Sequence, residues 1–142
     1  MQYDVSTAHR RRALFAMFRQ AEEDPSSGPT GVFVQIRDSP YRLASRFAPR
    51  GRAPFDDRGR WALEALAFLD ARGLSEADWN VRAAESAGVA TTLAPLGAKR
   101  CADLLEHAYF LTAANLHVLF GNGITGPAPS RERFERMAGM SA

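Results

Sequence analysis

The segment from about Pro95 to Phe120 constrains the fold most, because its pattern is that of one long helix. The C-terminal half of this helix is apolar nearly all round. Such a helix must be covered by other elements, so it predicts the centre of a helical bundle. Gly121 predicts its end, since glycine readily adopts the left-handed conformation that closes many helices. The residues expected on its core face are Leu104, Leu105, Ala108, Leu111 and Leu119.

Four shorter helices are expected around it, at about 7–24, 57–72, 76–87 and 130–138. Each follows a residue whose side chain can accept a hydrogen bond from the first turn, namely Ser6 or Thr7, Asp56 or Asp57, Ser75, and Ser130. Ser75 and Asp78 have the spacing of a capping box, and Gly73 suits the end of the preceding helix. Trp61, Phe68 and Trp79 are expected to join leucines of the long helix in the core.

Two short runs rich in β-branched residues, Gly31–Ile36 and Val89–Leu93, have the composition of strands. A lone strand leaves its backbone groups unpaired, so these runs are expected to pair with each other or with a second chain. The fold class predicted is therefore mainly α: a small helical bundle of about five helices with a minor two-strand β element. Residues 1–142 are expected to form a single domain.

Residues 37–60 are predicted to be an arginine-rich, irregular loop, because prolines and glycines interrupt any helical period apart from a helical turn around 41–47. Basic residues are concentrated in this half of the chain. Residues 1–60 hold 11 arginines against 7 acidic residues, and Lys99 is the only lysine among the 18 basic residues. A polyanion is expected to approach here. GC-rich coding would also explain the arginine excess, and this alternative stays open.

The composition and the motifs argue against a membrane-spanning protein, a protein with internal disulfides and several classes of enzyme. The longest apolar stretch, 108–120, is too short to span a membrane and contains polar residues. Cys101 is the only cysteine, so no internal disulfide can form, and a cytoplasmic location without membrane contact is expected. We find no phosphate loop, nucleophile elbow or zinc-ligand spacing, so no cofactor, metal site or catalytic residue is predicted.

Residues Phe68–Trp79 resemble the helix-turn-helix motif, with Gly73, an apolar residue and a capping serine in the turn. Counted as far as Arg82 in the second helix, the resemblance covers about fifteen residues. It departs from the motif where the second helix exposes Glu76, Asp78 and Glu85, which would repel a phosphate backbone. Arg82 also falls where that motif usually has an apolar residue. An ordinary helical hairpin needs the same turn residues.

Two histidines lie on the long helix. His107 is four residues from Asp103, so a surface carboxylate–imidazole pair is expected, and His117 is expected to be packed. Ten residues at about 1.5 Å each separate the two imidazoles by roughly 15 Å, so they cannot share one metal ion. An enzyme that uses His107, with partners from elsewhere in the chain, is the third and least favoured functional hypothesis.

The first hypothesis is a small non-enzymatic interaction protein that contacts a polyanion, such as nucleic acid or a ribonucleoprotein, through an arginine-rich N-terminal surface. Guanidinium groups pair with phosphates and aromatic rings stack on bases. The second hypothesis is a protein-only inhibitor or adaptor of a larger machine, of the kind that mobile genetic elements encode. The residues expected to bind are Arg12, Arg19, Arg42, Arg46, Arg50, Arg52, Tyr41, Phe47 and Phe55.

Overall fold

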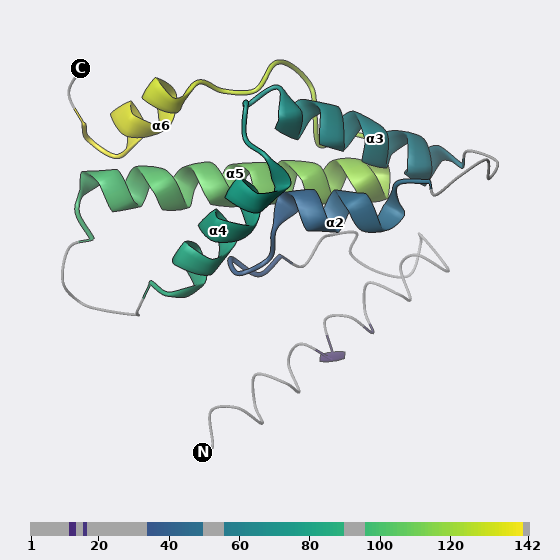
Figure 1. The fold of residues 1–142 in the computed structure, drawn as a ribbon, viewed down its shortest axis with the longest axis horizontal. Helices are drawn as coiled ribbons and strands as arrows, with labels where there is room; N and C mark the ends of the chain where they lie inside the picture. Colours follow the sequence, from purple (N-terminus) through teal and green to yellow (C-terminus); the bar gives the residue numbers. More distant parts are fainter. Residues whose placement is uncertain (1–11, 14–15, 17–33, 50–55, 90–95, 141–142) are drawn as a thin grey trace. The chain divides into compact units, whose positions relative to one another are not determined.

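The computed structural model describes residues 12–13, 16, 34–49, 56–89 and 96–140. It divides the chain into two compact units, residues 1–33 and 34–142. In the first unit, Arg12, Ala13 and Ala16 are helical and exposed, and the rest of the helix predicted at 7–24 lies outside the described residues. A single domain over residues 1–142 stays a prediction. The described helices of the second unit (Figure 1) are α2 (Pro40–Phe47), α3 (Asp57–Asp70), α4 (Glu76–Ala87), α5 (Ala98–Phe120) and α6 (Arg131–Met137).

The mainly helical fold is confirmed, and the local signals at the helix ends explain why. The carboxylate of Asp56 accepts a hydrogen bond from the backbone N–H of Gly59 at 2.7 Å and begins α3. Ser75 and Asp78 form the capping box of α4. Gly121 ends α5 in the left-handed conformation, with φ of 72°. None of the described helices is long and apolar enough to cross a membrane.

The prediction of an irregular loop over 37–60 is wrong for part of its length. Pro40–Phe47 form α2, a helix of two turns, whereas α3 begins at Asp57, where the helix over 57–72 was predicted. Ser39 caps α2 by accepting a hydrogen bond from the backbone N–H of Arg42 at 3.4 Å, and Pro40 stands at the first helical position, where its missing N–H costs nothing. Residues 50–55 of this segment lie outside the described residues.

No strand occurs among the residues that the structure describes. Of the two runs predicted as strands, Val34 and Gln35 are irregular, Ile36 begins a turn, and Val89 follows Gly88, the C-cap of α4. In that turn the N–H of Asp38 donates to the carbonyl of Gln35 at 2.8 Å. The other residues of both runs lie outside the described part of the chain.

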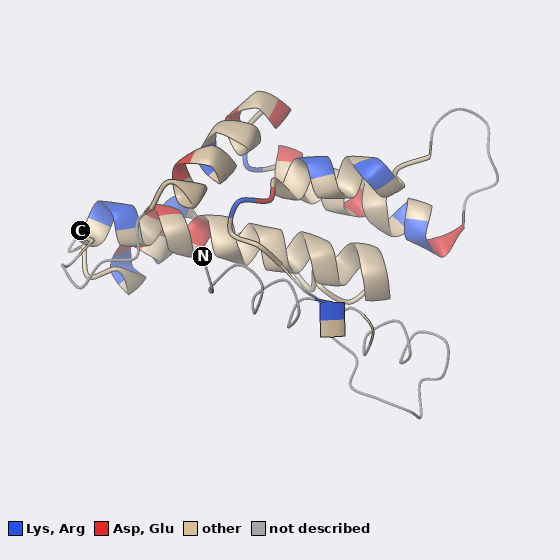
Figure 2. Ribbon diagram, turned by 90° about the horizontal axis from the view of Figure 1, so that it is seen from below, with Lys and Arg blue, Asp and Glu red and all other residues tan. Residues whose placement is uncertain are grey.

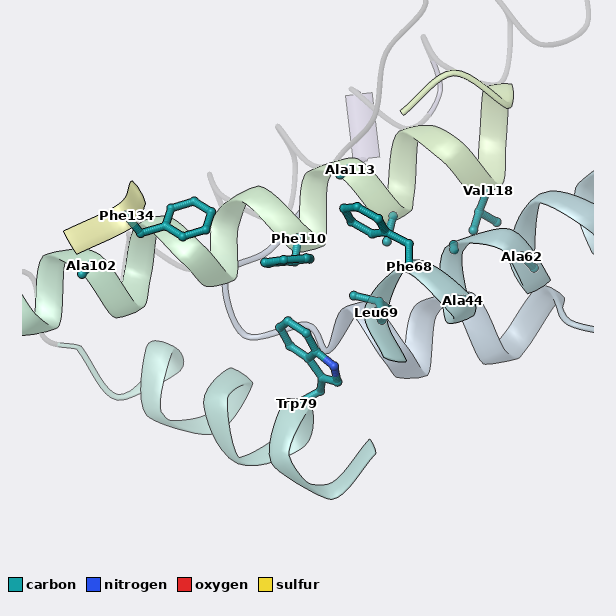
Figure 3. Packing of buried hydrophobic residues seen from close by; sticks show 12 residues of the cluster. Ala44, Ala62, Phe68, Leu69, Trp79, Ala102, Phe110, Ala113, Val118 and Phe134 are labelled. Atoms are coloured by element: carbon teal, nitrogen blue, oxygen red, sulfur yellow. The ribbon is translucent and has the colours of Figure 1, made fainter. Parts of the chain in front are cut away.

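Helix α5 occupies the centre, as predicted, and contacts each of the other four described helices (Figure 1). Figure 3 shows its core side chains: the ring centroid of Phe110 lies 5.3 Å from that of Phe68 and 5.2 Å from that of Trp79. Near α2 and α3 the contacts are made by small side chains. The fully buried alanines there are Ala44, Ala62, Ala65 and Ala114, which allow the helix backbones to approach closely.

The core face of α5 differs from the predicted one. Leu111 is buried, but Leu104, Ala108 and Leu119 are only half-buried, and Leu105 is 38% exposed. Trp61 on α3 is also only half-buried. The buried residues of α5 are Ala102, Glu106, His107, Phe110, Leu111, Ala113, Ala114, Asn115, His117 and Val118. The helix is thus rotated so that polar side chains expected at the surface point inward.

Two glycines allow the chain after α5 to fold back against the bundle. A Cβ at Gly121 would lie 2.5 Å from the ring of Trp61, and one at Gly123 would collide with the backbone carbonyl of Ala113. Real Cβ atoms do not approach other atoms so closely. Only glycine therefore fits at these two positions without movement of the neighbouring chain.

The rotation of α5 predicts opposite outcomes for two leucines on the same helix. Leu111→Ala should lower the free energy of unfolding by about 2–5 kcal/mol, because it opens a cavity in a packed interior. Leu105→Ala should lower it by less than about 1 kcal/mol, because that side chain is already partly in water. Urea denaturation followed by circular dichroism measures both. Equal losses would show that the face is assigned wrongly.

Candidate functional site

Most of the described residues of the predicted binding surface lie on α2. Arg42 and Arg46 are four residues apart on this helix and are both exposed. Phe47 is 39% exposed, whereas Tyr41 is half-buried and packs against the core. Arg12 is exposed in the N-terminal unit. The remaining predicted residues, Arg19, Arg50, Arg52 and Phe55, lie outside the described part of the chain.

The exposed ring of Phe47 has a cationic neighbour. The guanidinium carbon of Arg58, from the first turn of α3, lies 5.7 Å from the centroid of the Phe47 ring. A cation over an aromatic face is attracted by the quadrupole of the ring. Arg58 therefore adds its positive charge to that of Arg46 at the C-terminal end of α2.

The described arginines differ in the partners that their guanidinium groups have. Arg37, Arg42 and Arg46 are exposed and have no carboxylate within ion-pair distance among the described residues. In Figure 2, blue segments mark the basic residues along the helices. Three others, Arg72, Arg82 and Arg131, instead turn toward one acidic side chain of α5.

That side chain is Glu106, which has no exposed surface. Its Oε1 accepts hydrogen bonds from Nε and Nη2 of Arg72 at 2.7 and 2.5 Å. Its Oε2 accepts from Nη1 of Arg82 at 2.7 Å and from Nη1 of Arg131 at 2.6 Å. Both oxygens are thus satisfied by cations, as a buried carboxylate requires.

Burial raises the pKa of Glu106, but the hydrogen bonds from the three guanidinium groups outweigh it and hold the pKa below its ordinary value. Arg131 also pairs with Asp103 at 2.7 Å and with Glu135 at 2.9 Å. Those carboxylates raise the pKa of Arg131 further, against the effect of its burial. This cluster is therefore ionised at neutral pH, and we call Glu106 with its three arginines the Glu106 cluster.

The Glu106 cluster was not predicted from the sequence. One signal for it was present: Arg82 occupies a position that is usually apolar in the helix-turn-helix pattern, and its guanidinium is indeed directed into the structure toward Glu106. Its guanidinium also lies 5.7 Å from the ring centroid of Trp79. The exposed face of α4 keeps the acidic residues Glu76, Asp78 and Glu85. It therefore does not have the charge of a DNA-reading helix.

The surface pair expected between His107 and Asp103 is wrong. His107 is fully buried, and its Nε2 donates to the backbone carbonyl of Ile36 at 2.8 Å. Asp103 instead binds Arg131 and Lys99. Burial lowers the pKa of His107, with a contribution from the positive charge of Arg82, so the imidazole is neutral at neutral pH. With no exposed surface, this imidazole gives no support to the hypothesis of an enzyme that uses His107.

His117 is packed, as expected, and its Nε2 lies 2.8 Å from Oε2 of Glu64, a half-exposed carboxylate of α3. Within the described part of the chain, no group of three or more His, Cys, Asp or Glu side chains could hold a metal ion. Comparison of this chain with protein-family models, with curated proteins and with solved structures finds no match.

The Glu106 cluster predicts a large effect of a small substitution. Glu106→Gln removes the charge but keeps the shape, and it should lower the free energy of unfolding by about 3–5 kcal/mol at pH 7, because three guanidinium groups lose their counter-charge. Since the folded pKa lies below the unfolded value of about 4.3, the wild-type advantage should persist above that pH and shrink below it. Chemical denaturation at pH 7 and pH 3.5 measures both effects.

The matched control is Lys99→Ala, which breaks an exposed pair with Asp103 and should change stability by less than about 0.5 kcal/mol. If Glu106→Gln is as mild as this control at pH 7, the cluster does not hold the helices together.

His107 predicts a second pH dependence. Its folded pKa is lower than its unfolded value of about 6.5, so the folded protein binds this proton less readily than the unfolded chain. The free energy of unfolding should therefore fall as the pH drops below about 6.5. His107→Gln keeps an N–H for the carbonyl of Ile36 and should lose less stability between pH 7 and pH 5 than the wild type. Equal losses in the two proteins would place the titrating group elsewhere.

Proposed function

We propose that α2 presents a polyanion-binding surface and that single-stranded nucleic acid is the ligand that suits it best. The observation that carries the proposal is the exposure of Arg37, Arg42 and Arg46 without carboxylate partners among the described residues. Exposed guanidinium groups of this kind form charge-assisted hydrogen bonds with phosphate oxygens. Binding of this type needs no sequence-reading element.

The aromatic ring at the end of α2 supports a single strand over a duplex. Phe47 offers a partly exposed ring, and stacking on unpaired bases tolerates any sequence. In a duplex the bases are already stacked on each other. Helix α4, the element that resembles a recognition helix, is acidic on its exposed face and is expected to repel the phosphates of a duplex groove.

The alternative is a protein-only inhibitor or adaptor that uses the same surface, with Tyr41, Phe47 and Phe55 as aromatic anchors. Of the two anchors that the structure describes, Phe47 is partly exposed and Tyr41 packs against the core. The aromatic part of that interface is therefore small in the described residues. A complex from the native host that survives nuclease treatment would favour this alternative over the nucleic-acid proposal.

The salt dependence of binding tests the proposal. The double substitution Arg42→Ala, Arg46→Ala should weaken binding to a fluorescent oligothymidylate several-fold at low salt. It should also reduce the slope of log affinity against log salt by about 1.4, since each phosphate contact to a single strand contributes about 0.7. Fluorescence anisotropy over a series of salt concentrations gives both values.

The matched control removes the same charge from α6, where Arg133 and Arg136 are exposed and have no ion-pair partner among the described residues. Arg133→Ala, Arg136→Ala should leave the slope within experimental error of the wild type. The proposal is wrong if the wild type does not bind at low salt, or if both double variants reduce the slope equally.

A further inference from the structure

An apolar groove of about 580 Å³ runs between α5 and α6. Its lining includes Leu105, Tyr109, Thr112 and Leu116 from α5 and Phe134 and Met137 from α6. Three of these side chains have much of their surface in water: Leu105 is 38%, Tyr109 41% and Met137 63% exposed. Exposed apolar side chains gathered in one groove are typical of an interaction site, whereas single ones need no explanation.

The apolar stripe on α5 has the spacing that packs against another helix. Leu105, Tyr109, Thr112 and Leu116 are separated by four, three and four residues, as are the contact positions of a helix–helix seam. Helix α5 has no Asp, Glu, Lys or Arg after Glu106. At about 1.5 Å per residue the stripe is roughly 16 Å long, which matches three turns of a partner helix.

The charge at the groove indicates what kind of helix fits. Arg133 is the only charged residue among the described residues that line the groove, and Arg136 lies exposed beside Met137 on α6. The acidic residues of α6, Glu132 and Glu135, do not line the groove. A partner with carboxylates along the flank that meets α6 would therefore complement this edge, and a partner with basic residues there would be repelled.

We propose that this groove binds an amphipathic helix of a partner protein, with apolar side chains toward α5 and acidic side chains toward Arg133. The described residues include no strand, so addition of a strand to a sheet edge is not available to them. The site is concave, which suits an inserted helix better than the flat surface of a bilayer. This inference uses residues of α5 and α6 and does not depend on the polyanion proposal for α2.

Two synthetic helical peptides test the groove with the full-length protein. Both carry leucine at positions i, i+4, i+7 and i+11; one has glutamates on the flanking positions and its twin has lysines there. By isothermal titration calorimetry, the glutamate peptide should bind at least about tenfold more tightly than the lysine peptide. Arg133→Glu should reverse this preference. Leu105→Glu and Met137→Glu should each weaken the glutamate peptide at least about tenfold.

Val81→Glu is the control, because Val81 is 57% exposed on α4 and does not line the groove. It should leave binding unchanged, and circular dichroism should show that all four variants keep the helical fold. Equal affinity for the twins, no binding of either, or equal weakening by the control overturns the proposal. So does a wild-type dimer in sedimentation experiments that Leu105→Glu dissociates, since the occupant would then be a second copy. Binding to anionic lipid vesicles that Leu105→Glu abolishes overturns it as well.

Discussion

The buried carboxylate of Glu106 is the constraint on which the arrangement of the helices depends. A carboxylate on α5 that has left water needs cations on both oxygens, and the three that it finds come from different parts of the chain. Arg72 lies in the turn after α3, Arg82 on α4 and Arg131 on α6. One acidic side chain therefore fixes the rotation of α5 about its axis and attaches three neighbouring segments to it. The aromatic contacts of Phe110 then fill the space that this rotation leaves beside α4 and α6.

The same cluster changes what the arginine content means for function. The arginines that surround Glu106 are structural, and Glu106, Asp103 and Glu135 offset their charge within the cluster and at its edge. Those of α2 have no such counter-charge among the described residues, so their field extends into solvent. The net charge of +2 conceals this division, because it adds neutralised and free guanidinium groups together. In the proposal made for α2, a polyanion therefore responds to exposed guanidinium groups and not to the total charge.

Most helix boundaries could be predicted because they depend on local backbone chemistry. The capping box of Ser75 and Asp78 and the left-handed Gly121 act within a few residues, and the sequence displays them directly. The core face of α5 could not be predicted in this way. Its stripe of leucines and its buried stripe are both largely apolar, so periodicity did not decide between them. The deciding residue, Glu106, has partners 24 to 34 residues away, and a pattern analysis places a lone glutamate outside. In the candidate site, Arg42 and Arg46 are four residues apart and are exposed on the same helix. Only a helical turn was predicted where α2 forms, because Pro40 was taken as a helix breaker, whereas it occupies the first helical position.

Helix α6 shows how the buried charge and the apolar groove are connected. Its seven residues are too few to form a stable helix alone, so it depends on contacts with α5. Those contacts are Phe134, which packs on Tyr109 and Phe110, and Arg131, which binds Glu106 and Asp103. Phe134 holds α6 through apolar contact area, and Arg131 holds it through ion pairs that require Glu106 and Asp103 to be ionised. Helix α6 forms one wall of the groove and α5 forms its floor. Glu106 on α5 binds Arg131 of α6, so the same carboxylate positions α6 and sets the rotation of the α5 stripe from Leu105 to Leu116. A helix bound in the groove would contact only one face of α5, while the opposite face stays committed to the core, so the bundle need not open to accept it.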